Sequence, residues 1–297
     1  MTRFLQAIVQ GLTSGGVYAL IALAFSIIYM TTRVINFAQG EVLMIGAYIY
    51  FYMAAPKGGA GLAWPIALFV ALVGAMIVGL VVHAISIAPL GKFDPNTNIG
   101  WILTTLSVSL IAVEVVRNLA GEQAKRIDPV VKTFGGKSTI FSIEPKQYLI
   151  LIVGVVLALV LEVLHSKTQL GRALRATAHD KATASLMGIN TGFMVRYSFA
   201  IAGILGGIGG WLLAPVIFVD PNMGTLVGLT AFVAAVVGGI GSTRGALVGG
   251  LTIGVVESLA KWAGAGEWST AMVFLTLILI LVLKPTGILG EALIEKV

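Results

Sequence analysis

The sequence lacks cysteine and is poor in charge, and both shortages restrict its class. Without cysteine, neither a disulfide framework nor thiolate chemistry is available. Charged residues make up only 11% of the 297 residues and hydrophobic residues make up 58%, whereas about a quarter of the residues of a soluble domain are charged. The chain therefore has too little charge to cover a water-facing surface. Together with a mean hydropathy of +0.99, this composition predicts a single transmembrane domain over residues 1–297.

The residue patterns that indicate enzyme chemistry are also missing. His83, His165 and His179 lie in different segments and lack the spacing of metal ligands. No Ser-His-Asp set or carboxylate pair can be assembled, so we expect no catalytic residue, no metal and no cofactor. The net charge of +6 does not predict nucleic-acid binding, because the cations lie in the gaps between apolar runs, as in the loops of membrane proteins.

The sequence contains instead a series of long apolar runs. A bilayer core of about 30 Å needs about 20 apolar residues per helix. We therefore predict an all-α, polytopic transmembrane helix bundle of about eight to ten spans, with a re-entrant element as an alternative between the seventh and eighth. A count of the cations on the two sides does not decide the orientation. The candidate spans are 6–29, 39–55, 62–83, 99–117, 147–165, 194–218, 225–240, 246–262 and 268–283.

Glycine is abundant, with 37 residues, and many glycines are spaced four apart. In lipid, small residues at this spacing let helix backbones approach each other closely. The pattern indicates either ordinary tight packing or a bundle that shifts during transport. The glycines that we assign to helix packing are Gly203, Gly206, Gly207, Gly210, Gly238, Gly239 and Gly241.

The polar gap at 167–190 contains a helix-forming segment. Residues 172–187 are rich in Ala, Leu, Arg and Lys, which favour helices, and Gly188 is a natural C-terminal stop. We predict a short, basic helix with small side chains outside the bilayer. Such a helix fits a groove of a partner protein, or it lies on the lipid headgroups as an amphipathic loop helix.

Four stretches, in order along the chain, resemble the permeases of branched-chain amino acid ABC transporters, the LivH family. The first combines residues 15–23 with 34–41 and 46–48, and the second combines 170–180 with Ala184 and 187–190. The third is 234–246 and the fourth is 283–290. The segments 91–98 and 118–146 depart from the family pattern, so substrate or partner specificity is expected to differ there.

This resemblance implies an ATP-driven importer in the bacterial inner membrane. Its expected partners are a second permease of the LivM type, two cytoplasmic ABC ATPases and a periplasmic substrate-binding protein, besides the lipid bilayer. The resemblance implies branched-chain or related amino acids as substrates, with urea, short amides or aromatic acids as alternatives. It also implies that the segment 167–190 is a cytoplasmic coupling helix that docks on an ATPase. The residues assigned to coupling are Gly171, Arg172, Ala173, Arg175, Ala176, Asp180, Ala184, Gly188 and Ile189.

Glu41 is an acidic residue at the edge of a span, with no cation three or four residues away. A carboxylate near a helix N-terminus is stabilised by the free N–H groups and the helix dipole, which is the structural interpretation. The functional interpretation is that a carboxylate at the membrane edge lines the translocation path or a gate. The residues assigned to this path are Asn36, Phe37, Gly40, Glu41 and Gly46.

Three other acids lie near span ends, each with a cation close in sequence. The pairs are Glu114 with Arg117, Glu257 with Lys261, and Glu162 with Lys167. All three are interpreted as neutralised helix ends. An ion-coupled secondary transporter, the remaining alternative, would usually carry an ionisable group in mid-membrane. The position of the acids therefore favours an ATP-driven importer.

Overall fold

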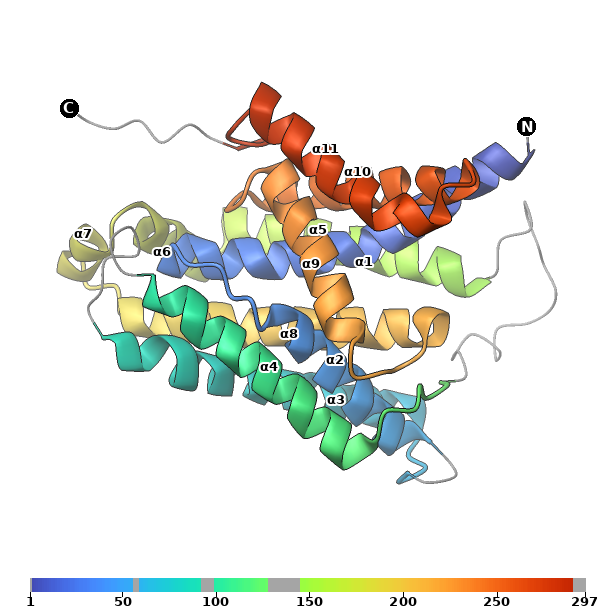
Figure 1. Cartoon of the computed structure of the whole chain (residues 1–297). Helices are drawn as coiled ribbons and strands as arrows, with labels where there is room; N and C mark the ends of the chain where they lie inside the picture. Colours follow the sequence, from blue (N-terminus) through green and yellow to red (C-terminus); the bar gives the residue numbers. More distant parts are fainter. Residues whose placement is uncertain (1, 56–58, 92–98, 128–144, 291–297) are drawn as a thin grey trace. The chain divides into compact units, whose positions relative to one another are not determined.

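The computed structural model describes residues 2–55, 59–91, 99–127 and 145–290, and over these ranges it is almost entirely helical (Figure 1). The predicted all-α, polytopic class is confirmed. The single β-type contact in these ranges is an isolated bridge between Lys125 and Val219. The helices are α1 (Thr2–Thr32), α2 (Gln39–Ala54), α3 (Trp64–Val82), α4 (Gly100–Ala120), α5 (Pro145–Lys167), α6 (Gln169–His179), α7 (Lys181–Leu186), α8 (Thr191–Ile217), α9 (Met223–Gly238), α10 (Thr243–Trp262) and α11 (Ser269–Leu283).

Each of the nine predicted spans corresponds to one of these helices, but the helices differ in length. Within the described ranges, six helices are long and apolar enough to cross a membrane. They are α1, α3, α4, α5, α8 and α11. Helices α2 and α9 have 16 residues each, which corresponds to about 24 Å and falls short of a 30 Å hydrocarbon core. The chain is a multi-pass protein of the inner membrane.

The end of α3 is irregular because of a proline. The helix passes into a π-helical turn, His83–Ile87, and then into a 3-10 turn, Ala88–Leu90. Pro89 cannot donate the backbone hydrogen bond that would continue the α-helix. Within the same turn, the carbonyl of Ser86 accepts a hydrogen bond from the Thr104 hydroxyl of α4 at 2.9 Å. The rearranged turn is thus held by a neighbouring helix.

The chain divides into two compact units. One unit comprises Ile27–Gly136 and His165–Leu229, and in it α2, α3 and α8 lie side by side (Figure 1). Glycine permits these contacts, because a Cβ added to Gly203 of α8 would lie 2.5 Å from the Ala75 carbonyl oxygen. A Cβ on Gly210 would collide with the Leu43 carbonyl of α2. Gly206 and Gly207 of the same helix also face α2 and α3.

The other unit comprises Met1–Ser26, Lys137–Leu164 and Thr230–Val297. Here too glycine brings helices together: a Cβ on Gly11 of α1 would lie 2.7 Å from the Val255 Cα of α10. The three remaining packing glycines, Gly238, Gly239 and Gly241, lie at the α9–α10 turn, where Gly239 has φ +106° and Gly241 has φ +87°.

The three sequence pairs of acid and cation have different outcomes. Glu114 pairs with Arg117, and Glu257 pairs with Lys261 at 2.6 Å, as the helical spacing predicts. The pairing of Glu162 with Lys167 is wrong, because Glu162 Oε1 lies 2.8 Å from Nε of Arg244. A helix end that is distant in sequence therefore supplies its partner.

Candidate functional site

The loop between α5 and α8 forms two short helices, α6 and α7, and not the single helix that was predicted. Asp180 separates them, with an extended backbone at φ −154° and ψ 114°. Its carboxylate accepts hydrogen bonds from the Ala182 N–H at 2.8 Å and from the Thr183 hydroxyl. These bonds make Asp180 the N-cap of α7, and an N-cap residue leaves the helical conformation. Asp180 therefore caps the start of α7 and, because its own backbone is not helical, ends α6.

Both outer ends of this loop are capped by residues of the chain itself. At the start of α6, the Thr168 hydroxyl accepts a hydrogen bond from the Gly171 N–H at 3.1 Å. At the end of α7, the Ile189 N–H donates to the Ala184 carbonyl at 3.0 Å, and Gly188 has φ +83°. This is the bonding of a Schellman motif, which favours glycine at its left-handed position. The predicted stop at Gly188 is confirmed.

One face of α6–α7 packs against the permease itself. Leu174 is fully buried and Ala184 is 4% exposed. A Cβ on Gly171 would lie 2.5 Å from the His165 Cα at the end of α5. Gly171 and Ala184, which the sequence assigned to coupling, thus lie on the inner side of the loop. Replacing Ala184 by a bulky residue would therefore disrupt packing within the permease and would not test contact with a partner.

Two arginines tie the loop to neighbouring segments. The Arg175 guanidinium donates to the carbonyls of His165 and, at 3.3 Å, Ser166. It thereby satisfies free carbonyl groups at the C-terminus of α5. Arg33, which follows α1 and has φ 58°, donates through Nη2 to the Ala178 carbonyl of α6 at 2.7 Å. The segment that leads into α2 is thus bonded directly to the loop.

The opposite face of α6–α7 is open. Arg172 and Asp180 are exposed, while Ala173, Ala176 and Ile189 are half-buried. Two apolar side chains that the sequence interpretation did not assign to coupling are the most exposed on this face: Leu186 at 89% and Met187 at 79%. Their position directly before Gly188, at the end of an otherwise polar helix, was the available signal.

Glu41 lies in the first turn of α2 and is 2% exposed. Its Oε1 accepts a hydrogen bond from the Thr225 hydroxyl at 2.9 Å, and Thr225 lies in the first turn of α9. Ser109 of α4 lies near the same carboxylate. Its Oε2 has no hydrogen-bond partner in the described part of the chain. The carboxylate is therefore placed at two helix N-termini, which favour negative charge, but is only half satisfied.

Other path residues gather at the start of α2. Asn36 is 1% exposed and its Oδ1 accepts a hydrogen bond from the Ala38 N–H at 3.2 Å. Phe37 is half-buried in the turn before the helix. A Cβ on Gly224 of α9 would lie 2.7 Å from the carbonyl oxygen of Gly40. The two helix starts thus touch backbone to backbone beside Glu41, whereas Gly46 packs on α8.

The buried polar atoms near Glu41 are incompletely paired. Nδ2 of Asn36 and the hydroxyl of Tyr48 have no hydrogen-bond partner among the residues that the structure describes. Tyr48 is 4% exposed and follows Glu41 by two helical turns, so it lies on the same side of α2. Because buried polar atoms are nearly always hydrogen-bonded, this group is suited to contact a polar solute or a polar group of another chain.

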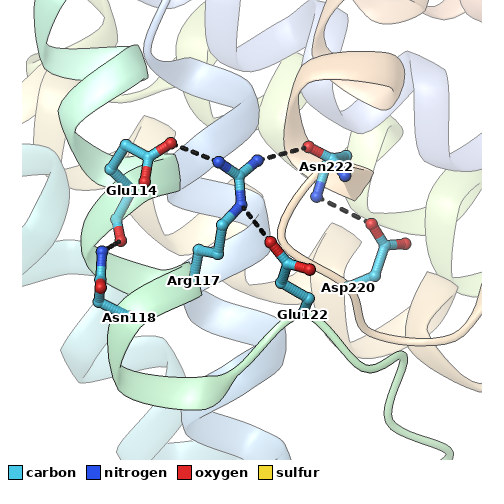
Figure 2. A network of polar contacts seen from close by, with 6 residues as sticks. All are labelled: Glu114, Arg117, Asn118, Glu122, Asp220 and Asn222. Atoms are coloured by element: carbon cyan, nitrogen blue, oxygen red, sulfur yellow. Dashed lines mark hydrogen bonds and ion pairs between the residues drawn. The ribbon is translucent and has the colours of Figure 1, made fainter.

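A polar network fixes the start of α9 (Figure 2). Arg117 at the end of α4 pairs with Glu114, lies 3.8 Å from Glu122, and donates to the Asn222 Oδ1 at 3.4 Å. Asp220 in turn accepts a hydrogen bond from the Asn222 N–H at 2.8 Å. The network connects α4 to the turn before α9. It thereby supports the placement of Thr225, three residues farther on.

Comparison with known proteins gives concordant matches over nearly the whole chain. Residues 7–283 match the family described as branched-chain amino acid transport system / permease component. The chain is 34% identical to the high-affinity branched-chain amino acid transport system permease protein LivH of Escherichia coli, over 99% of this chain and 98% of the relative. It is 34% identical to BraD of Pseudomonas aeruginosa over the same shares of the two chains. A solved structure, PsaBC from Streptococcus pneumoniae in complex with Fab, is similar in fold, with a TM-score of 0.51 and 13% identity over 95% of this chain and 92% of that chain.

Proposed function

The chain belongs to the family of permease components of branched-chain amino acid transport systems, and from this membership we propose that it imports branched-chain or related amino acids. It is the membrane-spanning subunit of an ABC importer and not itself an enzyme. Its proposed partners are a second permease of the LivM type, two cytoplasmic ATPases and a periplasmic substrate-binding protein.

The open face of α6–α7 is the proposed docking surface for an ATPase. The observation that carries this assignment is the exposure of Leu186 and Met187, at 89% and 79%. Large apolar side chains that project from a polar loop indicate a contact with another protein, and burying such anchors supplies much of the energy of an interface. Arg172, Ala173 and Ala176 complete the surface, together with Asp180, Gly188 and Ile189.

Arg33 provides a physical connection between this surface and the membrane path. Its hydrogen bond to the Ala178 carbonyl holds the end of α6, and the chain continues from Arg33 through Asn36 into the first turn of α2. An ATPase that binds α6–α7 more tightly in one of its states would bias the permease toward one conformation. A displacement of α6 would then move Arg33, which is connected to Glu41 by eight residues of continuous chain.

Glu41 supports an amino acid as the substrate. An amino acid carries an α-ammonium group, which a carboxylate with a free oxygen binds by a charge-assisted hydrogen bond. Urea and short amides are neutral, so their binding would not offset the desolvation free energy of a buried carboxylate. We therefore assign Glu41, with Asn36 and Gly40 beside it, to the translocation path.

The docking assignment is tested at Leu186. The variants Leu186→Asp and Leu186→Met are expressed together with the candidate ATPases, partner permease and binding protein. Leu186→Asp should insert normally but lose both co-purification with the ATPases and leucine uptake, because a charge cannot enter an apolar contact. Leu186→Met, which keeps the apolar bulk, should retain both. Normal uptake and ATPase recovery with Leu186→Asp would refute this docking surface.

A further inference from the structure

A pocket of about 370 Å³ lies beside the coupling loop and belongs neither to the docking surface nor to the Glu41 path. Pockets of this size accept small ligands or headgroups. Its wall comes from four segments: the end of α1, the irregular turns after α3, the start of α7 and the start of α8. The lining residues are Thr32, His83, Ile87, Ala88, Gly91, Lys181, Gly192, Val195 and Arg196.

The charge of this pocket has one sign. Lys181 and Arg196 line it, and none of the described lining residues is acidic. Both cations are exposed, and neither forms an ion pair or a hydrogen bond within the described part of the chain. Desolvation, together with the charge of Arg33, lowers the pKa of Lys181. Two unpaired cations, with Arg33 as a third cation nearby, create a positive potential that favours binding of an anion.

The surroundings of the pocket are those of a membrane interface. The pocket lies at the C-terminal end of the apolar span Trp64–Leu90 and at the start of the span Thr191–Ile217. Apolar side chains within two residues of its lining residues are exposed: Ile85 at 58%, Val81 at 47% and Phe193 at 46%. Lipid acyl chains that cover these side chains therefore lie directly beside the pocket, so a phospholipid can place its headgroup in the pocket while its acyl chains stay in the bilayer.

We propose that this pocket binds the phosphate-bearing headgroup of an anionic phospholipid, with the phosphate at Lys181 and Arg196 and the acyl chains along α3 and the start of α8. Basic pockets between membrane helices are a recurrent type of site for such headgroups. Lys181 is also the first residue of α7. A bound lipid therefore holds the α6–α7 loop against the start of α8, next to the proposed ATPase surface.

The test measures lipid retained by the full-length permease. The protein is purified in mild detergent, exposed to equal amounts of phosphatidylglycerol and phosphatidylcholine, and examined by native mass spectrometry. The wild type should retain phosphatidylglycerol selectively. The double variant Lys181→Gln/Arg196→Gln should bind it about 30-fold more weakly, since each basic residue near a headgroup strengthens binding about fivefold. The matched control Lys167→Gln/Arg172→Gln removes two cations from the same loop outside the pocket and should retain the lipid.

Two results would overturn the proposal. Equal retention of phosphatidylglycerol by the wild type and the pocket variant would show that these cations do not bind lipid. Displacement of the lipid by millimolar inorganic phosphate, together with loss of the preference for phosphatidylglycerol, would assign the pocket to a free small anion. Circular dichroism of the pocket variant establishes that a reduced lipid signal does not come from unfolding.

Discussion

The carboxylate of Glu41 is stabilised by backbone and held incompletely by side chains. It lies at the starts of α2 and α9, and the Thr225 hydroxyl satisfies only one of its two oxygens. If Glu41 served only to start α2, an exposed position with both oxygens solvated would suffice. At 2% exposure the second oxygen has no hydrogen-bond partner in the described chain, although Ser109 lies near the carboxylate, and a transported ammonium group is a candidate partner.

Replacing Glu41 by Gln should reduce transport without removing the protein from the membrane. The dipole contribution of a carboxylate at a helix start is about 0.3–1 kcal/mol, so insertion should remain normal. Loss of a hydrogen bond to a charged group, about 1.5–3 kcal/mol, should lower leucine uptake roughly tenfold to hundredfold. Uptake of labelled leucine, normalised to permease in the membrane, measures both effects.

The control for this substitution is Glu267→Gln. Glu267 is also acidic but is exposed and forms no ion pair in the described part of the chain, and exposed charges contribute little, so uptake should stay near the wild-type value. Wild-type uptake with Glu41→Gln would leave Glu41 only its role at the helix start.

The separation of α6 from α7 depends on Asp180. Hydrogen bonds from the Thr183 hydroxyl and from the backbone N–H groups of Ala182 and Thr183 lower the pKa of this carboxyl. Because the folded pKa is depressed, the ionised cap stabilises α7 above the pKa of the unfolded chain. This stabilisation is lost as the pH falls through the lowered folded pKa. The start of α7 should therefore be fully capped at neutral pH and loosen only in acid.

Asp180→Ala should expose the start of α7 at every pH, and this can be measured by hydrogen–deuterium exchange of a peptide covering 181–186. The variant should exchange faster than the wild type at pH 7, and the two should converge in acid. Asp180→Asn keeps an N-cap without a titrating group, so its exchange, after correction for the intrinsic pH effect, should lack the acid transition. Equal protection of Asp180→Ala and the wild type at pH 7 would contradict the capping role.

Helices α2 and α9 are joined through glycine backbones. A Cβ on Gly40 would collide with the Gly224 carbonyl, and a Cβ on Gly228 would lie 2.9 Å from the Gly40 Cα. Gly40→Ala should therefore lower stability by about 1–3 kcal/mol, the usual cost of overpacking, and reduce uptake by moving Thr225 away from Glu41. The midpoint of thermal unfolding in detergent measures the first effect.

Gly266→Ala is the matched control for Gly40→Ala. Gly266 has no atom within 4 Å of an added Cβ and lies outside the left-handed region. Its replacement should leave the unfolding midpoint and uptake unchanged. If both variants unfolded at the wild-type temperature, the α2–α9 contact would not limit stability.

At the scale of the whole molecule, the positions of the membrane helices could be predicted because apolar runs are a property of consecutive residues. All nine predicted spans are helices, and Pro65 marks the start of α3. The ranges predicted for α2 and α9, 39–55 and 225–240, agree closely in length with the 16 residues of each helix, but hydropathy does not distinguish a short buried helix from a full span.

The candidate site was less predictable because its contacts join distant segments. Nothing near Thr225 in sequence indicates that its hydroxyl bonds to Glu41, 184 residues away. Arg244 likewise replaces the nearby Lys167 as the partner of Glu162. Asp180 is different: Asp is a preferred N-cap residue, so the break between α6 and α7 could have been read from the sequence.

The orientation of the molecule follows from the docking proposal and not from charge, because the cations are nearly evenly divided between the two sides. The α6–α7 loop should be cytoplasmic, and the turn after α4, at the opposite end of that helix from the pocket, should be periplasmic. Ser185 and Gln123 are both exposed and mark these two regions.

Single cysteines at Ser185 and Gln123 test this orientation without removing any native thiol, because the chain has none. An impermeant maleimide applied to intact cells should label Gln123→Cys and should label Ser185→Cys only after the membrane is opened. Labelling both after permeabilisation controls for accessibility. If Ser185→Cys reacts in intact cells while Gln123→Cys does not, α6–α7 faces away from the ATP supply. No cytoplasmic ATPase could then dock on Leu186 and Met187, and the exposed apolar pair would require a periplasmic partner.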